Sequence, residues 1–302
     1  MIPWLFLKKQ IESLFPKIQF DDKMENITDT VNYFKKGSKK YGNGYYYFII
    51  HFHIYYLDQL RLYLEYIFKI KVAHLLVITV TGKKNKNFYK MIKSFENINL
   101  KILFFENEGY DILPFLKVLS ILPKKDCLLA KVHTKNIRDK VTLEWINEGL
   151  RSILASDVYV ESVIRSFDSD KSLLMLGSKK LYKNTKKFMY ENEEFFCYMC
   201  SLLSNRKYTI DMNATGFFAG SMFWAKKSIF LELRDQMRDL KFENSIQNSG
   251  SDGSIWHAVE RIFGMLPLFY GGTISTVDFS STVDFKFAQN PRPSLLPVTH
   301  TF

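Results

Sequence analysis

Residues 45–70 read YYYFIIHFHIYYLDQLRLYLEYIFKI, and this stretch sets the fold class. Its first part, residues 45–56, is dense in aromatic and β-branched side chains, which is typical of a buried strand. Its second part, residues 57–70, places apolar side chains at helical spacing. A strand that runs directly into an amphipathic helix is the repeating unit of an α/β protein.

The same alternation continues along the first half of the chain. HLLVITVTG predicts a strand at residues 74–82, NKNFYKMIKSFENI a helix at 85–98, LKILFFEN a strand at 100–107, YDILPFLKVLSIL a helix at 110–122, and DCLLAKVHTKN a strand at 126–136. Strands separated by helices of this length form right-handed units in which the strands are parallel. The sequence therefore predicts an α/β fold with a mostly parallel sheet, helices on both faces and a Rossmann-like nucleotide-binding core.

The second half follows a less regular pattern. Residues 145–167 predict one long helix, 171–178 a strand, 179–209 a basic segment followed by a helix, and 214–233 an apolar strand leading into a helix. Ahead of the last predicted helix, Ser251 or Asp252 is well placed as its N-cap.

The domain organisation predicted from these patterns is simple. An N-terminal extension covers residues 1–44, and a single α/β domain covers residues 45–302. Within that domain, residues 45–140 form a nucleotide-binding half and residues 141–302 an acceptor half.

Composition restricts the class of protein. The chain has 302 residues, of which 47% are hydrophobic and 16% aromatic, enough for a large core. No apolar run approaches the roughly 20 residues of a membrane-spanning helix, and the apolar block at the start is too short for a signal peptide. We therefore expect a cytoplasmic protein.

The net charge of +11 favours an anionic partner. The lysines form short clusters at residues 35–40, 83–86 and 179–187, and none lies in a helix-turn-helix, zinc-finger or RNA-binding signature. Nucleic acid is therefore not the expected partner. A phosphate-bearing substrate fits the charge, and the clusters at 35–40 and 179–187 also suit peripheral contact with the inner, anionic face of a membrane.

Metal-ligand patterns are weak. Cys197 and Cys200 form a single C-x-x-C within a predicted helix, which favours helical core thiols over zinc or redox chemistry. His257 and Glu260 lie three residues apart without a third partner nearby in sequence, so packing and surface pairing are favoured over metal binding. No metal site and no cofactor is predicted.

Polar residues close several of the predicted strands. His53 ends the first, Thr81 the second, Glu106 to Asp111 follow the third, and His133 to Asn136 follow the fourth. In parallel sheets, ligands bind beyond the carboxyl ends of the strands. These residues are therefore expected to meet at one edge and to form a site.

Four blocks of sequence carry a resemblance to a known family. ENEGYDILPFL, AKVHTKN, GFFAGSMFWAK and SDGSIWHAVERIFG, in this order, resemble the rhamnan synthesis protein F family over about residues 46–275. That family contains glycosyltransferases that build rhamnose-rich and related surface polysaccharides. Its members often read E-N-R-G-R-D in the first block, whereas this chain has Glu108 and Tyr110 in place of the arginines.

The resemblance implies a glycosyltransferase A-like fold and a specific activity. A sugar, rhamnose or a related one, would pass from a nucleotide sugar to a growing bacterial surface polysaccharide or to a lipid-linked acceptor. Many enzymes of this architecture hold a divalent metal with an Asp-x-Asp at the end of a central strand. Here His133, Thr134 and Lys135 stand in that place, and we expect them to bind the diphosphate without a metal.

Roles for the remaining site residues are predicted from this resemblance together with their positions at strand ends and in loops. Asp252 is the expected base for the acceptor hydroxyl, with Asp111 and Glu106 as alternatives. Gly220, Phe223, Trp224 and His257 are expected to form the acceptor site or a sugar platform, with packing in the core as the equally weighted alternative for Phe223 and Trp224. The residues expected to bind the donor or its nucleotide are His53, Thr81, Glu106, Asn107, Gly109, Asp111 and Thr134.

Two other readings stay open. A non-catalytic carbohydrate-binding or assembly subunit of a polysaccharide-synthesis complex would keep the fold without turnover. A basic nucleic-acid-binding domain would account for the charge. Diphosphate release from an activated sugar separates the transferase from the first, and one-to-one binding of a nucleoside diphosphate separates it from the second.

Overall fold

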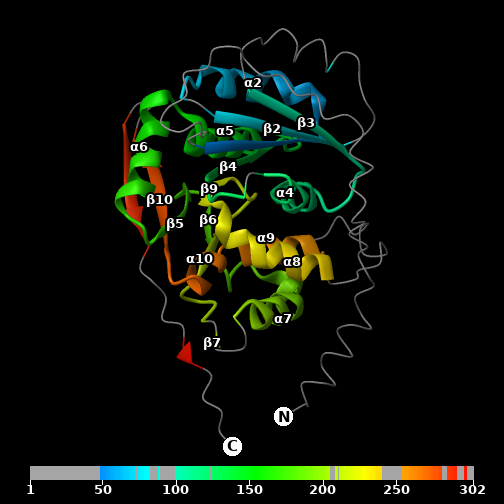
Figure 1. Ribbon diagram of the computed structural model, residues 1–302, viewed down its shortest axis with the longest axis vertical. Helices are drawn as coiled ribbons and strands as arrows, with labels where there is room; N and C mark the ends of the chain where they lie inside the picture. The colour runs from blue at the N-terminus through cyan, green and yellow to red at the C-terminus, as the bar shows by residue number, and fades with distance from the viewer. Residues whose placement is uncertain are drawn as a thin grey trace, which may run out of the picture.

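The computed structural model describes residues 48–72, 74–81, 88, 99–122, 124–204, 208–209, 211–239, 254–280, 284–290 and 296–297. Across these residues the centre is one mixed sheet of eight strands, in the order β11-β10-β5-β9-β4-β1-β2-β3 (Figure 1). Its strands are β1 (Phe48–Ile54), β2 (His74–Thr81), β3 (Asn99–Phe105), β4 (Leu128–His133), β5 (Leu173–Ser178), β9 (Phe223–Lys226), β10 (Thr273–Phe279) and β11 (Phe285–Gln289).

The first four strands confirm the predicted parallel sheet. β1 pairs in parallel with β2 on one side and with β4 on the other, and β2 pairs in parallel with β3. The chain therefore runs outward from β1 to β3 and returns to the opposite side of β1 with β4. This reversal of strand order is a topological switch point, where α/β sheets form a crevice.

The other half of the sheet is mixed. β9 is antiparallel to both of its neighbours, β4 and β5, while β10 is parallel to β5 and β11 is antiparallel to β10. Because β9 runs the opposite way, its first residue lies at the edge where β1 and β4 end. Two short antiparallel pairs lie outside this sheet: β6 (Tyr182–Asn184) with β8 (Gly216–Phe218), and β7 (Tyr208–Thr209) with β12 (Leu296–Pro297).

Helices cover both faces of the sheet, as predicted (Figure 1). One face packs against η2 (Leu57–Gln59), α2 (Leu60–Lys69), α5 (Lys140–Leu154) and α6 (Asp157–Ser169). The other packs against α4 (Ile112–Leu119), η3 (Tyr190–Asn192), α7 (Glu193–Leu203), η4 (Lys227–Phe230), α8 (Leu231–Asp239), α9 (Ile255–Phe263) and α10 (Leu266–Phe269). Each helical layer has its own core, with the sheet between them.

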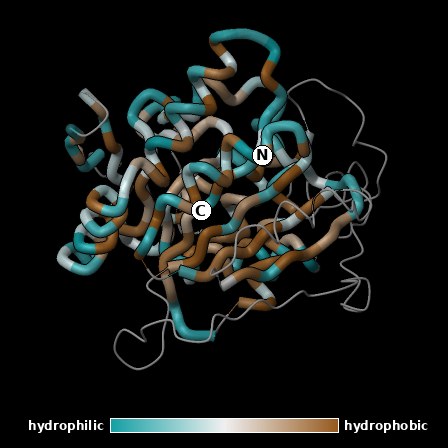
Figure 2. The backbone as a smooth tube through the Cα atoms, turned by 90° about the horizontal axis from the view of Figure 1, so that it is seen from above, coloured by the Kyte–Doolittle hydropathy of each residue, from teal (hydrophilic) through white to brown (hydrophobic). Residues whose placement is uncertain are grey.

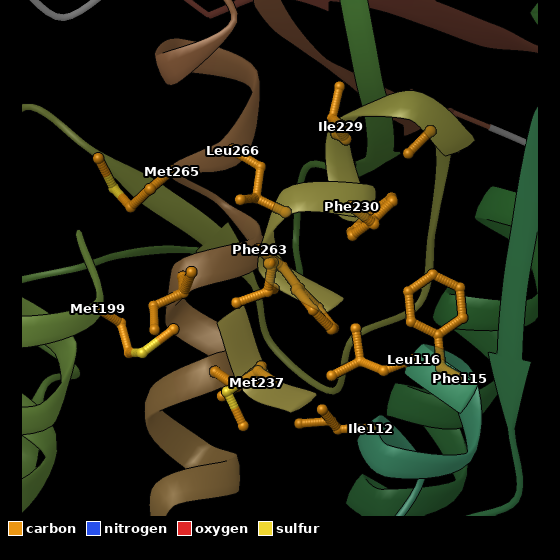
Figure 3. Packing of buried hydrophobic residues seen from close by; sticks show 14 of the residues in the cluster. Ile112, Phe115, Leu116, Met199, Ile229, Phe230, Met237, Phe263, Met265 and Leu266 are labelled. Atoms are coloured by element: carbon orange, nitrogen blue, oxygen red, sulfur yellow. The ribbon is translucent and has the colours of Figure 1, made fainter. Parts of the chain in front are cut away.

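The aromatic content fills these two cores. Figure 2 shows hydrophobic stretches concentrated along the strands and hydrophilic stretches in the outer parts. On the α4 side, Phe115 meets Phe230 and Phe263 edge to face, with ring centroids 5.0 and 5.8 Å apart (Figure 3). Each such ring contributes about 1.5–3 kcal/mol by burial. α4 is thereby held rigidly against the sheet beside the loop that precedes it.

Three predictions about the elements need correction. The single helix expected at residues 145–167 is two helices, because Ser156 leaves the helical conformation and its side chain caps α6 through the Tyr159 N–H. The N-cap of α9 is Ser254, whose side chain accepts from the His257 N–H, and not Ser251 or Asp252. Cys200 is a core thiol as expected, but Cys197 is exposed.

Some predictions fall on residues that the structure does not describe. These are the N-terminal extension with its lysine cluster, the lysines at 83–86, Asp252, and the helix at 85–98 apart from Phe88. Among the helices that are described, none combines the length and the apolar composition that crossing a membrane requires.

Candidate functional site

The switch point between β1 and β4 is closed by residues of the predicted site. His53 and His133 are register partners at the ends of these two strands. Thr134 follows, and its N–H donates to the His53 carbonyl at 3.0 Å. Its hydroxyl oxygen accepts from the N–H groups of Tyr55 and Tyr56, at 2.9 and 3.0 Å. Thr134 therefore ties the loop after β1 to the end of β4.

Buried histidines line the sheet on the α4 side of this point. The Thr79 hydroxyl lies 3.0 Å from Nε2 of His51 and 2.9 Å from Nδ1 of His53, and Thr81 Oγ1 lies 3.3 Å from Nε2 of His53. Burial lowers the pKa of His53 from 6.5 to about 3. His53 is therefore neutral near pH 7 and acts through hydrogen bonds rather than charge.

A buried ion pair between Lys131 and Asp111 lies next to the histidines, and the sequence analysis did not predict it. The Lys131 side chain is fully buried in β4, and its ammonium donates to the Asp111 carboxylate. It also donates to the Ser221 hydroxyl at 2.7 Å and to the Ser221 carbonyl at 3.2 Å. The Ser221 hydroxyl in turn donates to Asp111 at 2.5 Å. The three donors of Lys131 are thus used within the protein.

The ion pair controls the charge on Asp111. Burial alone would raise the pKa of this carboxyl, but the neighbouring His133 and Lys131, with hydrogen bonds from Lys131 and Ser221, hold it well below its ordinary range. Burial also lowers the pKa of Lys131, which Asp111 partly opposes. Asp111 is consequently a fixed anion that ties the loop before α4 to β4 and to the turn before β9.

The turn before β9 is clamped from several sides. Gly220 and Ser221 both have left-handed φ angles, +81° and +51°. The Gly220 carbonyl lies 2.6 Å from Nε2 of His133, and the Gly220 N–H donates to the Glu260 carboxylate. A Cβ at Gly220 would lie 1.7 Å from Cη2 of Trp145, so only glycine fits. This turn is therefore a rigid part of the site.

Burial shifts the pKa values of His133 and Glu260 in opposite directions, and in each case it favours the neutral form. Burial lowers the pKa of His133, although Asp111 and the Gly220 carbonyl favour its protonated form. Burial raises the pKa of Glu260, which Arg261 beside it opposes with an ion pair of 3.1 Å. Both side chains therefore bind the Gly220 backbone, His133 at its carbonyl and Glu260 at its N–H.

Lys135 is the cation of the predicted triplet nearest to solvent. Its Nζ lies 4.0 Å from the centre of the Trp145 ring, a cation–π distance. Its backbone is fixed by Gln59, which donates to the Lys135 carbonyl at 2.6 Å and accepts from its N–H at 3.2 Å. Among the described residues, no carboxylate forms an ion pair with its ammonium.

The other predicted site residues are of two kinds: some are exposed and form the rim of the site, and others are buried in the core. Glu106 and Asn107 are exposed in the loop after β3. Gly109 is buried with φ +63°, and a Cβ there would lie 2.4 Å from Cβ of Leu113. Phe223 and Trp224, expected as a sugar platform, are 1% and 0% exposed. Both rings are core residues in this structure and present no face to solvent.

The contacts of Trp224 explain why it is a core residue. Its indole N–H donates to the Ile153 carbonyl of α5 at 3.0 Å, and its ring lies 4.8 Å from that of Phe48. His257, by contrast, lies in the first turn of α9, with Nδ1 2.9 Å from the Ser254 hydroxyl and its ring 5.5 Å from that of Tyr110. His257 thus belongs to the rim.

Backbone strain marks the same place. Tyr110, Tyr190 and Ser221 are the non-glycine residues with left-handed φ in the part of the chain that the structure describes. Two of the three adjoin the ion pair, since Tyr110 precedes Asp111 and Ser221 binds it. Such conformations cluster at functional sites. Within the described ranges, no group of three or more histidine, cysteine or acidic side chains is arranged to hold a metal ion.

Comparison with known proteins agrees with this picture. Residues 22–270 match the family described as rhamnan synthesis protein F. The chain belongs to the rhamnan synthesis protein F family. The description of this family names rhamnan synthesis.

Curated relatives extend well beyond this chain. In two strains of Xanthomonas campestris pv. campestris, an uncharacterized protein named WxcX is 28% identical over 230 residues. That match covers 75% of this chain and 32% of the relative. The chain therefore spans about a third of the length of these relatives.

Proposed function

We propose that the chain is a glycosyltransferase module of the glycosyltransferase A type. It transfers a sugar, rhamnose or a related one, from a nucleotide sugar to a growing bacterial surface polysaccharide or a lipid-linked acceptor. The observation that supports this most is the convergence at the switch point, where Thr134, Lys135 and the clamped Gly220 turn meet beyond the ends of β1 and β4. In α/β sheets this is where nucleotides bind.

The diphosphate is proposed to lie against Lys135. The Lys131 ammonium is committed to Asp111 and Ser221, so it has no donor left for a ligand. His133 lies between two carbonyl oxygens, of Gly220 and Thr134. Lys135 is thus the cation of the triplet that can offset charge on a leaving diphosphate, and we propose that it does so without a divalent metal.

The base is proposed to be Asp252, which lies outside the described residues. Of the two alternatives, Asp111 is a poor base, because its pKa is held low and both Lys131 and Ser221 donate to its carboxylate. Glu106, the other alternative, is exposed on the rim of the site.

A peripheral membrane contact is proposed for the lysine clusters at 35–40 and 179–187, and also for the segment that runs from the loop after β4 into the first turn of α5. Residues 135–141 include three cations, and their one carboxylate, Asp139, caps α5 by accepting from the Thr142 N–H at 2.7 Å. Ile137 in this loop and Val141 in the first turn of α5 are 40% and 73% exposed. Basic residues beside exposed aliphatic side chains suit an anionic lipid surface.

One observation favours a non-catalytic carbohydrate-binding subunit as the second candidate. Asp111 and Lys131 neutralise one another inside the protein, so neither of these charges can act on a substrate. Turnover separates the two candidates. Release of nucleoside diphosphate from a nucleotide sugar supports the transferase, whereas saccharide binding without release supports the subunit.

The test of the proposed function begins with nucleotide binding. Thermal shift with UDP, GDP and dTDP, with and without manganese, should show one nucleotide that stabilises the protein by about 2.7 kcal/mol at 100 times its dissociation constant. Lys135→Ala should lower turnover by about 10²- to 10³-fold. Lys171→Ala is the matched control, since its side chain is 76% exposed and it precedes β5, at the opposite edge of the sheet. Equal activity of both variants, or abolition of activity by EDTA, contradicts the role given to Lys135.

A further inference from the structure

Phe223 and Trp224, the expected sugar platform, are buried, but another aromatic ring next to the site is exposed. Tyr110 is 44% exposed and lies between Gly109 and Asp111, next to the ion pair. Its ring centroid is 5.5 Å from that of His257, with the planes tilted by 37°. We propose that Tyr110, with His257 beside it, forms a subsite that stacks against a neutral sugar ring of the acceptor glycan. This rests on the proposed function and names its acceptor site.

The backbone holds the Tyr110 ring outward. Tyr110 has a φ of +53°, a conformation that a bulky side chain rarely adopts. It is fixed from both sides, because the N–H groups of Ile112 and Leu113 donate to the Gly109 carbonyl at 3.1 Å and Asp111 is bound to Lys131 and Ser221. The loop therefore fixes the direction of the Tyr110 Cα–Cβ bond before any ligand arrives.

Core packing does not account for this ring. A tyrosine that is nearly half exposed gains only part of the burial energy of a core aromatic, yet it occupies a backbone conformation suited to glycine or asparagine. Strained residues persist where their surroundings impose them, and they gather at ligand sites. A ligand stacked on the ring supplies the missing contact.

The charges around the ring select a neutral, hydroxylated ligand. The loop before Tyr110 contributes Glu106 and Asn107, both exposed, and Glu108, which is half-buried. Carboxylate and amide oxygens accept hydrogen bonds from sugar hydroxyls, while the aromatic ring contacts the C–H face of a pyranose. Two carboxylates in the loop that leads to the ring disfavour a phosphate there. The subsite therefore suits the acceptor saccharide, and the diphosphate belongs at Lys135.

Rhamnose fits this arrangement better than a fully hydroxylated hexose. It is a 6-deoxy sugar, so a methyl group replaces one hydroxymethyl and enlarges the apolar surface that a ring can cover. The family, whose description names rhamnan, makes this the first saccharide to test.

The test separates saccharide binding from nucleotide binding. Methyl α-L-rhamnopyranoside and a rhamnose trisaccharide serve as probes, with saturation-transfer NMR for contact and titration for affinity, and the stabilising nucleoside diphosphate is titrated in parallel. Tyr110→Ala should weaken saccharide binding by about tenfold, the upper range for one aromatic contact. Tyr110→Phe should retain it. In both variants diphosphate affinity should stay within about twofold of the wild type.

Tyr270→Ala is the matched control. Tyr270 is also 44% exposed, but it precedes β10 and so lies at the opposite edge of the sheet. Saccharide affinity unchanged in Tyr110→Ala overturns the subsite, as does the absence of saturation transfer from either rhamnoside to the wild-type protein. Tyr110-dependent saccharide binding in a protein that binds no nucleotide supports the subsite and overturns the transferase.

Discussion

Lys131→Met tests the ion pair that joins three segments of the site. The lysine is fully buried, and Asp111 has a side chain that is only 14% exposed. Methionine fills a similar volume, so the main effect is to leave the Asp111 carboxylate with the Ser221 hydroxyl but without its cation. Removing one partner of a buried pair costs about 3–5 kcal/mol. We expect Lys131→Met to lower the free energy of unfolding by that amount.

The assay is urea unfolding followed by tryptophan fluorescence and circular dichroism. Asp111→Asn is measured alone and together with Lys131→Met. Because the double variant contains neither charge, its loss should be smaller than the sum of the two single losses by about 2 kcal/mol or more. Lys227→Met is the control: Lys227 is 3% exposed, and its ammonium donates to the carbonyls of Lys124 and Lys125. That variant should lose only about 1–3 kcal/mol.

Acid should distinguish the charge effect from a packing effect. Without Lys131, two of the causes that lower the pKa of Asp111 are lost, so the carboxyl takes up a proton at a higher pH than in the wild type. The difference in stability between Lys131→Met and the wild type should therefore shrink as the pH falls from 7 to 5. A loss below about 1 kcal/mol, or single losses that simply add in the double variant, would refute this account of the pair.

The remaining predictions concern the turn, the histidines and the membrane. Gly220→Ala should displace Trp145 and weaken nucleoside diphosphate binding, which titration would show as a fall in affinity in a protein that still unfolds cooperatively. His53 has a folded pKa of about 3 against 6.5 unfolded, so its stabilisation is full above pH 6.5 and declines as the pH falls toward 3. Between pH 6 and 4 it adds about 1.4 kcal/mol per pH unit to the acid loss, and His53→Gln should flatten that slope in urea titrations. Val141→Asp should reduce sedimentation with vesicles containing phosphatidylglycerol, whereas Val158→Asp, 66% exposed in the first turn of α6, should not; equal effects would remove the membrane contact.

Local patterns predicted much of the sheet but not its complete order. The strand expected at residues 126–136 is β4, Leu128–His133, because alternating strands and helices are encoded by neighbouring side chains. The antiparallel placement of β9 between β4 and β5 depends on pairing between distant segments. No local pattern records the direction in which a strand will pair. The break at Ser156 was missed because apolar spacing continues across it.

The site was predictable where it depends on strand ends. His53, Thr81, Asp111 and His133 are brought together because parallel strands finish at one edge. Lys131 was not recognised, although a lysine inside an apolar strand is a signal that a buried anion accompanies it. Its partners, Asp111 and Ser221, lie 20 and 90 residues away. Burial of Phe223 and Trp224 could not be read from composition, since aromatic residues serve cores and platforms alike.

The position of β9 has a consequence for synthesis on the ribosome. β9 is the strand that joins β4 to β5, yet it is made after both. Until residues 223–226 emerge, β4 keeps an open hydrogen-bonding edge and β5 has no partner in the sheet, a state prone to edge-to-edge association. At about 5–20 residues per second, that interval after β5 lasts roughly 2 to 10 seconds. Nascent chains should therefore depend on chaperones during this window, and fragments that end before Phe223 should aggregate where chains that extend beyond Gln289, the end of β11, remain dispersed.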